Sequence, residues 1–213
     1  MTGRSRTVFF TIFLIIGLIV TAGCISVRTA DTHNTTAAIQ SYNAWTVQQG
    51  GVDRNIRGTV TMISDHVTTY NSEIAKDRPD LSVLRENLAT DRQTLDQWGS
   101  SLNALSVATD QFEKNTSALT YDNATEKQIR QTLGMMTQYM RIYSIESGNA
   151  RQHLIEYVKN AEAYIETDDP DYWNAQYHQD AMHAKELAKN SLINGDPALG
   201  NLTAQAQLLE QLQ

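Results

Sequence analysis

Two short, proline-containing segments of the sequence are rich in aspartate, and clustered carboxylates could bind a cation or a basic partner. One segment covers residues 77–80 and the other covers residues 168–171. Their acidic members are Asp77, Asp80, Asp168, Asp169 and Asp171. Several oxygen ligands together suit Ca²⁺, whereas a single Asp at a turn commonly caps a helix. The sequence therefore leaves a calcium site and plain helix caps open as alternatives.

Aromatic residues follow directly after the second acidic segment. They are Tyr172, Trp173 and Tyr177. Exposed Tyr and Trp side chains often anchor protein interfaces, but buried aromatic side chains also fill hydrophobic cores. The cluster is therefore a candidate for a recognition patch or, alternatively, for closing the core at a helix end.

The sequence lacks the usual motifs of metal, haem and nucleophilic chemistry. No histidine follows a glutamate at the Glu-x-x-His spacing of di-iron bundles. The single cysteine excludes Cys-x-x-Cys-His haem attachment and Cys-based metal sites. Neither a Gly-x-Ser-x-Gly motif nor a phosphate-binding glycine loop is present. We therefore expect no enzyme activity and no cofactor.

The composition of the chain also indicates which classes of partner it can bind. The chain has 213 residues, a net charge of -7 and 41% hydrophobic residues, which suffice for a core. An acidic chain lacks the basic stripe that nucleic-acid binding needs, so we expect no nucleic-acid partner.

The N-terminus has the features of an export signal. Arg4 and Arg6 precede a mostly apolar run at 8–20, and the small residues Ala22 and Gly23 come before Cys24. This ending resembles the lipobox of exported lipoproteins. The resemblance covers residues 1–24 only, and it implies that the Cys24 thiol carries lipid and that Cys24 becomes the new N-terminus.

Two alternatives to lipidation stay open. The segment 8–27 is long and apolar enough to span a bilayer as an uncleaved transmembrane anchor. The other alternative is a signal that is cleaved to leave a soluble product. Lipid and anchor agree in placing the body outside the cell, attached to the cell membrane. We expect a signal or anchor at 1–23, a flexible tether at 24–36 and an extracellular domain at 37–213.

Four Asn-x-Ser/Thr sequons are candidate acceptors for N-linked glycans. The asparagines are Asn34, Asn115, Asn123 and Asn201. All four lie in predicted loops, at predicted helix ends or in the tether, where a glycan can be accommodated.

Hydrophobic residues recur in alternating steps of three and four along residues 56–74, 81–112 and 129–164. This period of about 3.5 is typical of long helices that pack along a coiled-coil-like seam. Polar residues interrupt the seams at Asp91 and Thr109 on the second stretch, and at Ser147 on the third. Polar residues inside a seam favour a bundle that binds a ligand between its helices.

Turn signals divide the chain into an all-α, up-down antiparallel bundle of long helices, similar to a four-helix bundle with a short fifth helix. The expected helices are 37–76, 80–118, 124–166, 170–193 and 197–212. Gly50 and Gly51 should kink or break the first helix. The segment 194–197, Asn-Gly-Asp-Pro, should end the fourth helix and begin the fifth.

Alternating helix directions place both acidic segments at the end of the bundle far from the membrane. We therefore predict a membrane-tethered, non-enzymatic interaction or scaffold module that presents this distal tip to a protein partner. The alternative is an accessory, sensory-type bundle that binds a small ligand or Ca²⁺ outside the membrane. The distal tip comprises Asp77, Asp80, Asp168, Asp169, Asp171 and Trp173.

Overall fold

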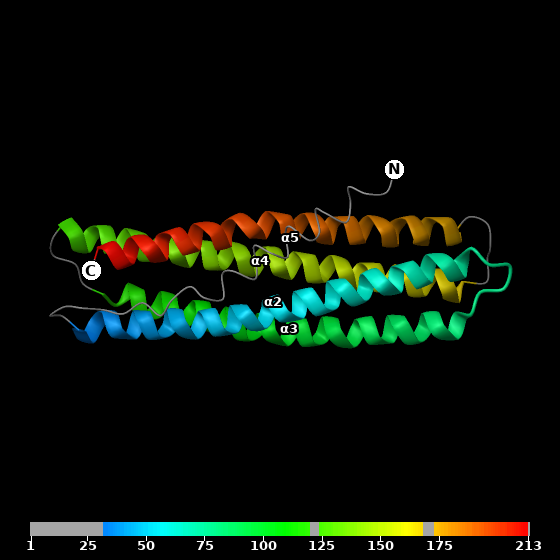
Figure 1. Cartoon of the computed structure of the whole chain (residues 1–213), viewed down its shortest axis with the longest axis horizontal. Coiled ribbons are helices and arrows are strands. Elements are labelled where there is room, and N and C mark those ends of the chain that lie inside the picture. Colours follow the sequence, from blue (N-terminus) through cyan, green and yellow to red (C-terminus); the bar gives the residue numbers. More distant parts are fainter. Residues whose placement is uncertain (1–31, 120–123, 168–172, 213) are drawn as a thin grey trace.

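The computed structural model describes residues 32–119, 124–167 and 173–212. These residues form four long antiparallel helices, which confirms the predicted all-α bundle (Figure 1). The helices are α2 (Thr32–Ile74), α3 (Leu81–Ser117), α4 (Ala124–Glu166) and α5 (Trp173–Gln211). Within these described ranges, no helix is both long and apolar enough to cross a membrane.

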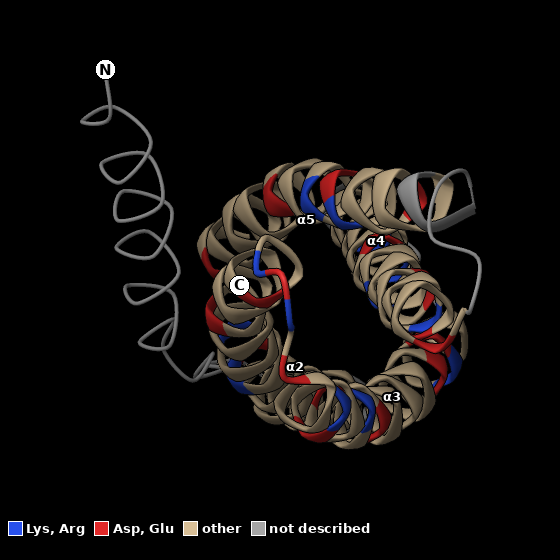
Figure 2. Cartoon of the chain, turned by 90° about the vertical axis from the view of Figure 1, so that its right-hand side faces the viewer, with Lys and Arg blue, Asp and Glu red and all other residues tan. Residues whose placement is uncertain are grey.

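The helices follow one another around a common axis (Figure 2). The backbones of α4 and α5 lie closest together, and α2 with α3 and α3 with α4 are also in extensive contact. In contrast, α2 and α5 complete the ring with very little direct backbone contact. The bundle therefore has three closed seams and one open seam.

The predicted helix register is correct. On α3 the seam side chains face the core, and Trp98 is fully buried at 0% exposure. The buried seam residues of this helix are Leu84, Leu88, Asp91, Leu95, Trp98, Leu105, Thr109 and Phe112. The bounds of α4 agree with the expected 124–166, whereas α2 begins earlier than the expected residue 37.

The predicted short fifth helix at 197–212 is wrong, because α5 continues through residues 194–197. Pro197 lacks an N–H and leaves one helical carbonyl without its partner. Burial outweighs that cost, because one apolar face of α5 continues past the proline in steps of three and four. The buried residues of this face are Ala181, Ala184, Ala188, Ser191, Gly195, Ala198, Leu202, Ala206 and Leu209.

The expected interruption at Gly50 and Gly51 is also wrong, because α2 is continuous through both residues. Two glycines cost helix stability, but buried aromatic and aliphatic side chains hold the helix on both sides. Trp45 before them and Val52 after them are 1% and 0% exposed. Tertiary packing therefore overrides the local preference.

Small side chains let α5 approach α4 closely. The most telling position is Gly195, where an added Cβ would lie 3.3 Å from the Cβ of Glu146 on α4. At Gly200, five residues further along the same helix, an added Cβ meets nothing within 4 Å. Of these two glycines, Gly195 lies where α5 packs closely on α4, and Gly200 does not.

We predict that Gly195→Leu destabilises the fold by about 1–3 kcal/mol, because the larger side chain forces α5 away from α4. Gly200→Leu is the matched control. It should stabilise the fold by up to about 1 kcal/mol, because leucine has the higher helix propensity. Urea unfolding followed by circular dichroism measures both variants. Equal effects at the two positions would contradict this packing of α5.

Trp98→Ala should lower the free energy of unfolding by about 3–5 kcal/mol, because the indole is fully buried. Gln97→Ala, at the exposed neighbouring position, should change it by less than about 0.5 kcal/mol. Chemical denaturation of the two variants makes the comparison. A small loss for Trp98→Ala would show that the register of α3 is wrong.

Candidate functional site

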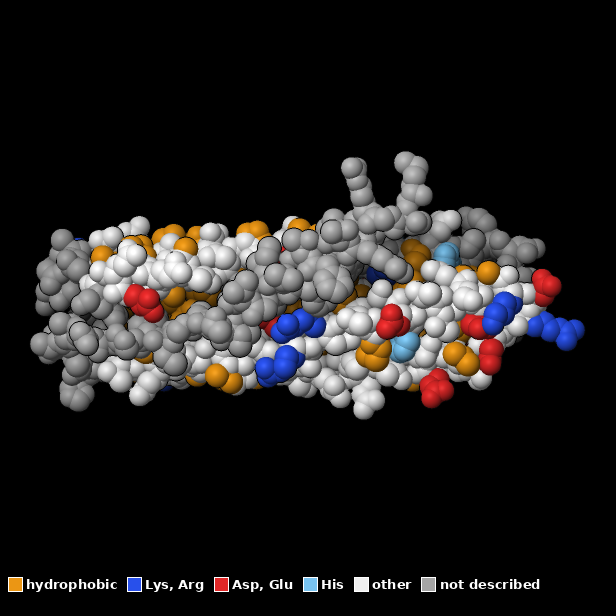
Figure 3. All heavy atoms as spheres, viewed as in Figure 1, with side chains coloured by type: hydrophobic (Ala, Val, Ile, Leu, Met, Phe, Trp, Pro, Cys, Tyr) orange, Lys and Arg blue, Asp and Glu red, His pale blue; other side chains and the backbone are white. Residues whose placement is uncertain are grey.

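The open seam between α2 and α5 contains a groove of about 480 Å³, with α4 as its floor. The space-filling view shows hydrophobic side chains at several places on this face of the bundle (Figure 3). The larger apolar residues that line the groove include Ile56, Val60, Ile63, Leu154, Leu192 and Leu199. Because its volume lies within the range of small-molecule sites, the groove is the candidate functional site.

Polar residues lie towards the two ends of the groove. Since α2 and α5 are antiparallel, Asp53 of α2 lies level with Asp196 of α5, together with Tyr143 of α4. At the other end, Lys185 and Lys189 of α5 lie towards the later groove residues of α2. The groove therefore has an acidic end, an apolar middle and a basic end.

Asp53 is the most deeply buried charge of the groove, with 6% of its surface exposed. The Tyr143 hydroxyl donates a hydrogen bond to Oδ1 at 2.5 Å, and the Gln49 amide donates one to Oδ2. Burial raises the pKa of Asp53, although the hydrogen bond from Tyr143 and the positive charge of Arg57 oppose the change. The carboxylate is thus held in place but poorly solvated.

The negative charge of Asp53 affects the pKa of two further groups at the acidic end. Burial raises the pKa of Asp196, and the negative charge of Asp53 adds to the change. Burial and then the Asp53 charge also raise the pKa of Tyr143, which therefore stays a hydrogen-bond donor. A bound positive charge would stabilise the carboxylates at the acidic end.

Asp91, the seam residue that was costliest to bury alone, has a partner in His66 of α2. Nδ1 of His66 lies 2.6 Å from Oδ1 of Asp91, which is 0% exposed. Burial raises the pKa of Asp91, and the contact with His66 opposes this. Neither residue lines the groove, so this pair is a buried polar contact between α2 and α3.

Thr109, the second polar seam residue, forms two hydrogen bonds within the core, whereas Oδ2 of Asp91 is buried without a partner among the described residues. The Thr109 hydroxyl accepts a hydrogen bond from Trp45 Nε1 at 2.9 Å and donates one to the carbonyl of Leu105 at 3.0 Å. Of the three polar seam residues, only Ser147 lines the groove.

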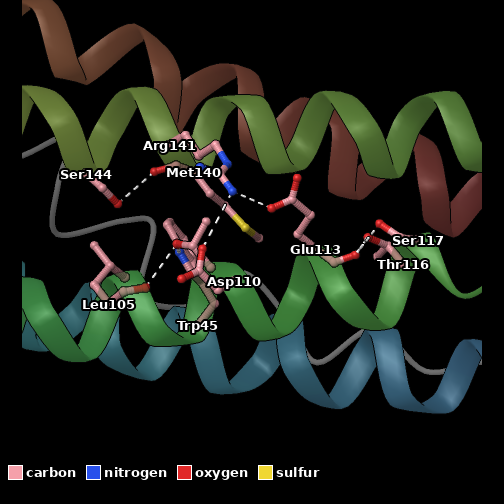
Figure 4. Close-up of polar contacts among 10 residues, drawn as sticks. Trp45, Leu105, Asp110, Glu113, Thr116, Ser117, Met140, Arg141 and Ser144 are labelled. Atoms are coloured by element: carbon pink, nitrogen blue, oxygen red, sulfur yellow. Dashed lines mark hydrogen bonds and ion pairs between the residues drawn. The ribbon is translucent and has the colours of Figure 1, made fainter.

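Charged residues on the outside of the bundle link neighbouring helices. Figure 4 shows Arg141 of α4 reaching towards Asp110 and Glu113 of α3. The Arg141–Asp110 contact measures 3.6 Å, and all three side chains are substantially exposed. Exposed ion pairs of this kind contribute little stability. None of these three residues lines the groove.

The described part of the distal tip consists of helix-capping contacts. The carboxylate of Asp80 accepts hydrogen bonds from the backbone N–H groups of Ser82 and Val83 at the start of α3, at 3.1 and 3.4 Å. A hydrogen bond from the Ser82 hydroxyl, followed by these two backbone hydrogen bonds, lowers the pKa of Asp80. Asp77 is exposed in the preceding turn.

The remaining tip residues cannot be placed against Asp77 and Asp80. Asp168, Asp169 and Asp171 lie outside the described residues, and Trp173 is described only as the first residue of α5. Within the described ranges, no group of three or more His, Cys, Asp or Glu side chains could hold a metal ion. The distal tip therefore remains a prediction.

The sequon asparagines have different surroundings. Asn115, near the end of α3, donates a hydrogen bond to the Ala37 carbonyl of α2 at 3.2 Å. Asn201 is exposed in the interior of the continuous α5 rather than near a helix end. Asn34 falls in the first turn of α2, while Asn123 and the lipid candidate Cys24 lie outside the described residues.

The groove was not predicted, although the sequence contains part of the signal. The seam of 56–74 extends backwards through Asp53 and Gln49 in steps of three and four, which would have placed both polar residues in the core. Asp196 was assigned to a helix break and therefore to a turn. Comparisons with family models, curated proteins and solved structures found no match for this chain.

We predict that Asp53→Asn becomes more stable relative to the wild type as the pH rises from about 3 to 7. The folded-state pKa of Asp53 lies above the unfolded value of about 3.9. Wild-type stability linked to this group is therefore present at low pH and is lost as the pH rises through the folded-state pKa.

Asp80→Asn is the control of opposite sign, because the folded-state pKa of Asp80 is lowered. This variant should lose stability relative to the wild type as the pH rises over the same range. Urea denaturation at several pH values gives both differences. Parallel pH dependence of the two variants would contradict the contrast between a buried carboxylate and a helix cap.

Proposed function

We propose that the chain is a membrane-tethered, extracellular, non-enzymatic binding protein that holds an elongated, mainly apolar small molecule between α2 and α5. The observation that carries the proposal is the groove of about 480 Å³ in the one open seam of the bundle. A ligand there would take the place of the helix–helix contacts that close the other seams.

The arrangement of the walls supports a small molecule. Ile56 and Val60 of α2 face Leu192 of α5 across the groove, and α4 closes the floor with Leu154. Burial of apolar ligand surface contributes about 25 cal/mol per Å², and the few polar groups at the ends restrict orientation. No turn joins α2 directly to α5, so their separation can adjust without straining a loop.

Of the two functions that the sequence left open, we favour ligand binding between the helices over a scaffold that binds a partner at its distal tip. A specific cavity favours the ligand, whereas the described acidic residue Asp80 is already engaged in capping α3. The tether remains part of the proposal and rests on residues 1–23 and on Cys24. Helices of about 60 Å would hold the groove clear of the lipid headgroups.

We expect dodecanol to bind the chain with a stoichiometry near one, measured by isothermal titration calorimetry. Val60→Trp should weaken this binding by at least about tenfold, or about 1.4 kcal/mol, because the indole occupies the groove. Val107→Trp is the matched control, since Val107 is exposed on α3 and does not line the groove.

The variants must keep the helical circular dichroism spectrum of the wild type for the comparison to count. Absence of dodecanol binding to the wild type would contradict the proposal. Equal weakening by Val60→Trp and Val107→Trp would show that dodecanol binds the surface without using the groove.

A further inference from the structure

Two charges of opposite sign lie on α5 at opposite ends of the groove. Lys185 and Asp196 both line it, and their separation of eleven residues corresponds to about three helical turns. They therefore share one face of α5, about 16 Å apart along the axis. In the described ranges, neither side chain forms a hydrogen bond or ion pair.

The surroundings of Asp196 give its end of the groove an excess of negative charge. Asp53 lies opposite on α2, and its charge acts on Asp196. The charges of two guanidiniums act on Asp53. Arg57 lines the groove and its Nε donates to the Asp53 carbonyl at 3.4 Å, whereas Arg54 is exposed and lies outside the groove lining. Among the residues that line this end of the groove, two carboxylates thus face one cation, so a second cation could be accommodated.

The surroundings of Lys185 have the opposite balance. Lys189 is paired with Glu186 at 2.8 Å, and both residues line the groove. This pair is locally neutral, and it leaves Lys185, which is half-buried, without a counter-charge. An anion could therefore bind here without breaking an existing contact.

Between these ends the groove is mainly apolar, with Val60 of α2, Leu154 of α4 and Leu192 of α5 in its walls. Its polar residues there include the uncharged Ser147 and Ser191. A polar group in the middle of a ligand would lose water there without gaining a charged partner.

Charges at the two ends, in contrast, would meet groups of opposite sign. These are the buried Asp53 with the exposed Asp196 at one end and the half-buried Lys185 at the other. The attraction is strongest where these groups are shielded from water.

We infer that the groove selects an elongated dipolar molecule, whose cationic group lies between Asp53 and Asp196, whose body is apolar and whose anionic group meets Lys185. This inference rests on the proposed function, because it specifies the ligand of the same groove. The separation of the charged ends fits an extended chain of about a dozen methylene groups.

Four probes with the same carbon chain test the inference by isothermal titration calorimetry at low ionic strength. They are ω-aminododecanoate, dodecylamine, dodecanoate and dodecanol, which carry both charges, one charge of either sign, or none. The wild type should bind ω-aminododecanoate at least about tenfold more tightly than dodecanol. Added salt should reduce this difference, because the groove is open to solvent at its rim.

Single-residue variants should separate the two ends of the ligand. Asp196→Asn should weaken ω-aminododecanoate and dodecylamine by at least about fivefold and should not weaken the other two probes. Lys185→Met should weaken ω-aminododecanoate and dodecanoate in the same way. Asp110→Asn and Lys114→Met, which change exposed residues of α3 outside the groove, should alter none of the affinities.

The outcomes distinguish this inference from the proposed function. If all four probes bind equally and neither groove variant discriminates among them, the dipolar ligand is wrong and the apolar groove remains. If Asp196→Asn weakens all probes alike, the residue acts on the fold and the inference is also wrong. If no probe binds the wild type, both the inference and the proposed function fail.

Discussion

The close packing of α5 on α4 determines the shape of the whole bundle. The buried face of α5 consists largely of Ala and Gly, so its backbone lies nearer to α4 than larger side chains would allow. A helix drawn towards one neighbour cannot approach the other equally, and α2 presents larger residues such as Ile56 and Ile63. The seam between α2 and α5 therefore stays open and becomes the groove. The same packing keeps α5 continuous, because a break at Pro197 would remove the second half of its buried face from α4.

Two buried carboxylates show how the bundle treats polar residues in its core. Asp91 meets His66 between α2 and α3, away from the groove, and holds two helices together. Asp53 accepts hydrogen bonds from Tyr143 and Gln49 but stands beside an open space and a second carboxylate. Burial opposes ionisation at both sites. Of the two, Asp53 lines the groove and Asp91 does not, so the charge of the proposed ligand could reach Asp53 but not Asp91.

Local sequence signals were reliable where they agreed with the hydrophobic period and unreliable where they opposed it. The seam through Leu88, Leu95 and Trp98 predicted the register of α3 correctly, because a regular apolar stripe can be buried in only one orientation. The turn signals around Pro79 also agreed with the structure. The helix-breaking signals at Gly50 and Pro197 did not agree with it, because α2 and α5 continue through these residues. Such residues destabilise a helix by only a few kcal/mol. Burial of the flanking residues exceeds that cost.

The sequence by itself determined the all-α class, the antiparallel order of the helices, the bounds of α4 and the buried faces. These properties follow from the period of the apolar residues and from polar turns between them, which are local features of the chain. Only the tertiary structure decided which seam stays open, because that depends on the relative sizes of side chains on helices far apart in sequence. It also decided that Asp53, Lys185 and Asp196 line one groove. Their proximity arises from antiparallel packing of the first and last described helices, and no spacing along the chain expresses it.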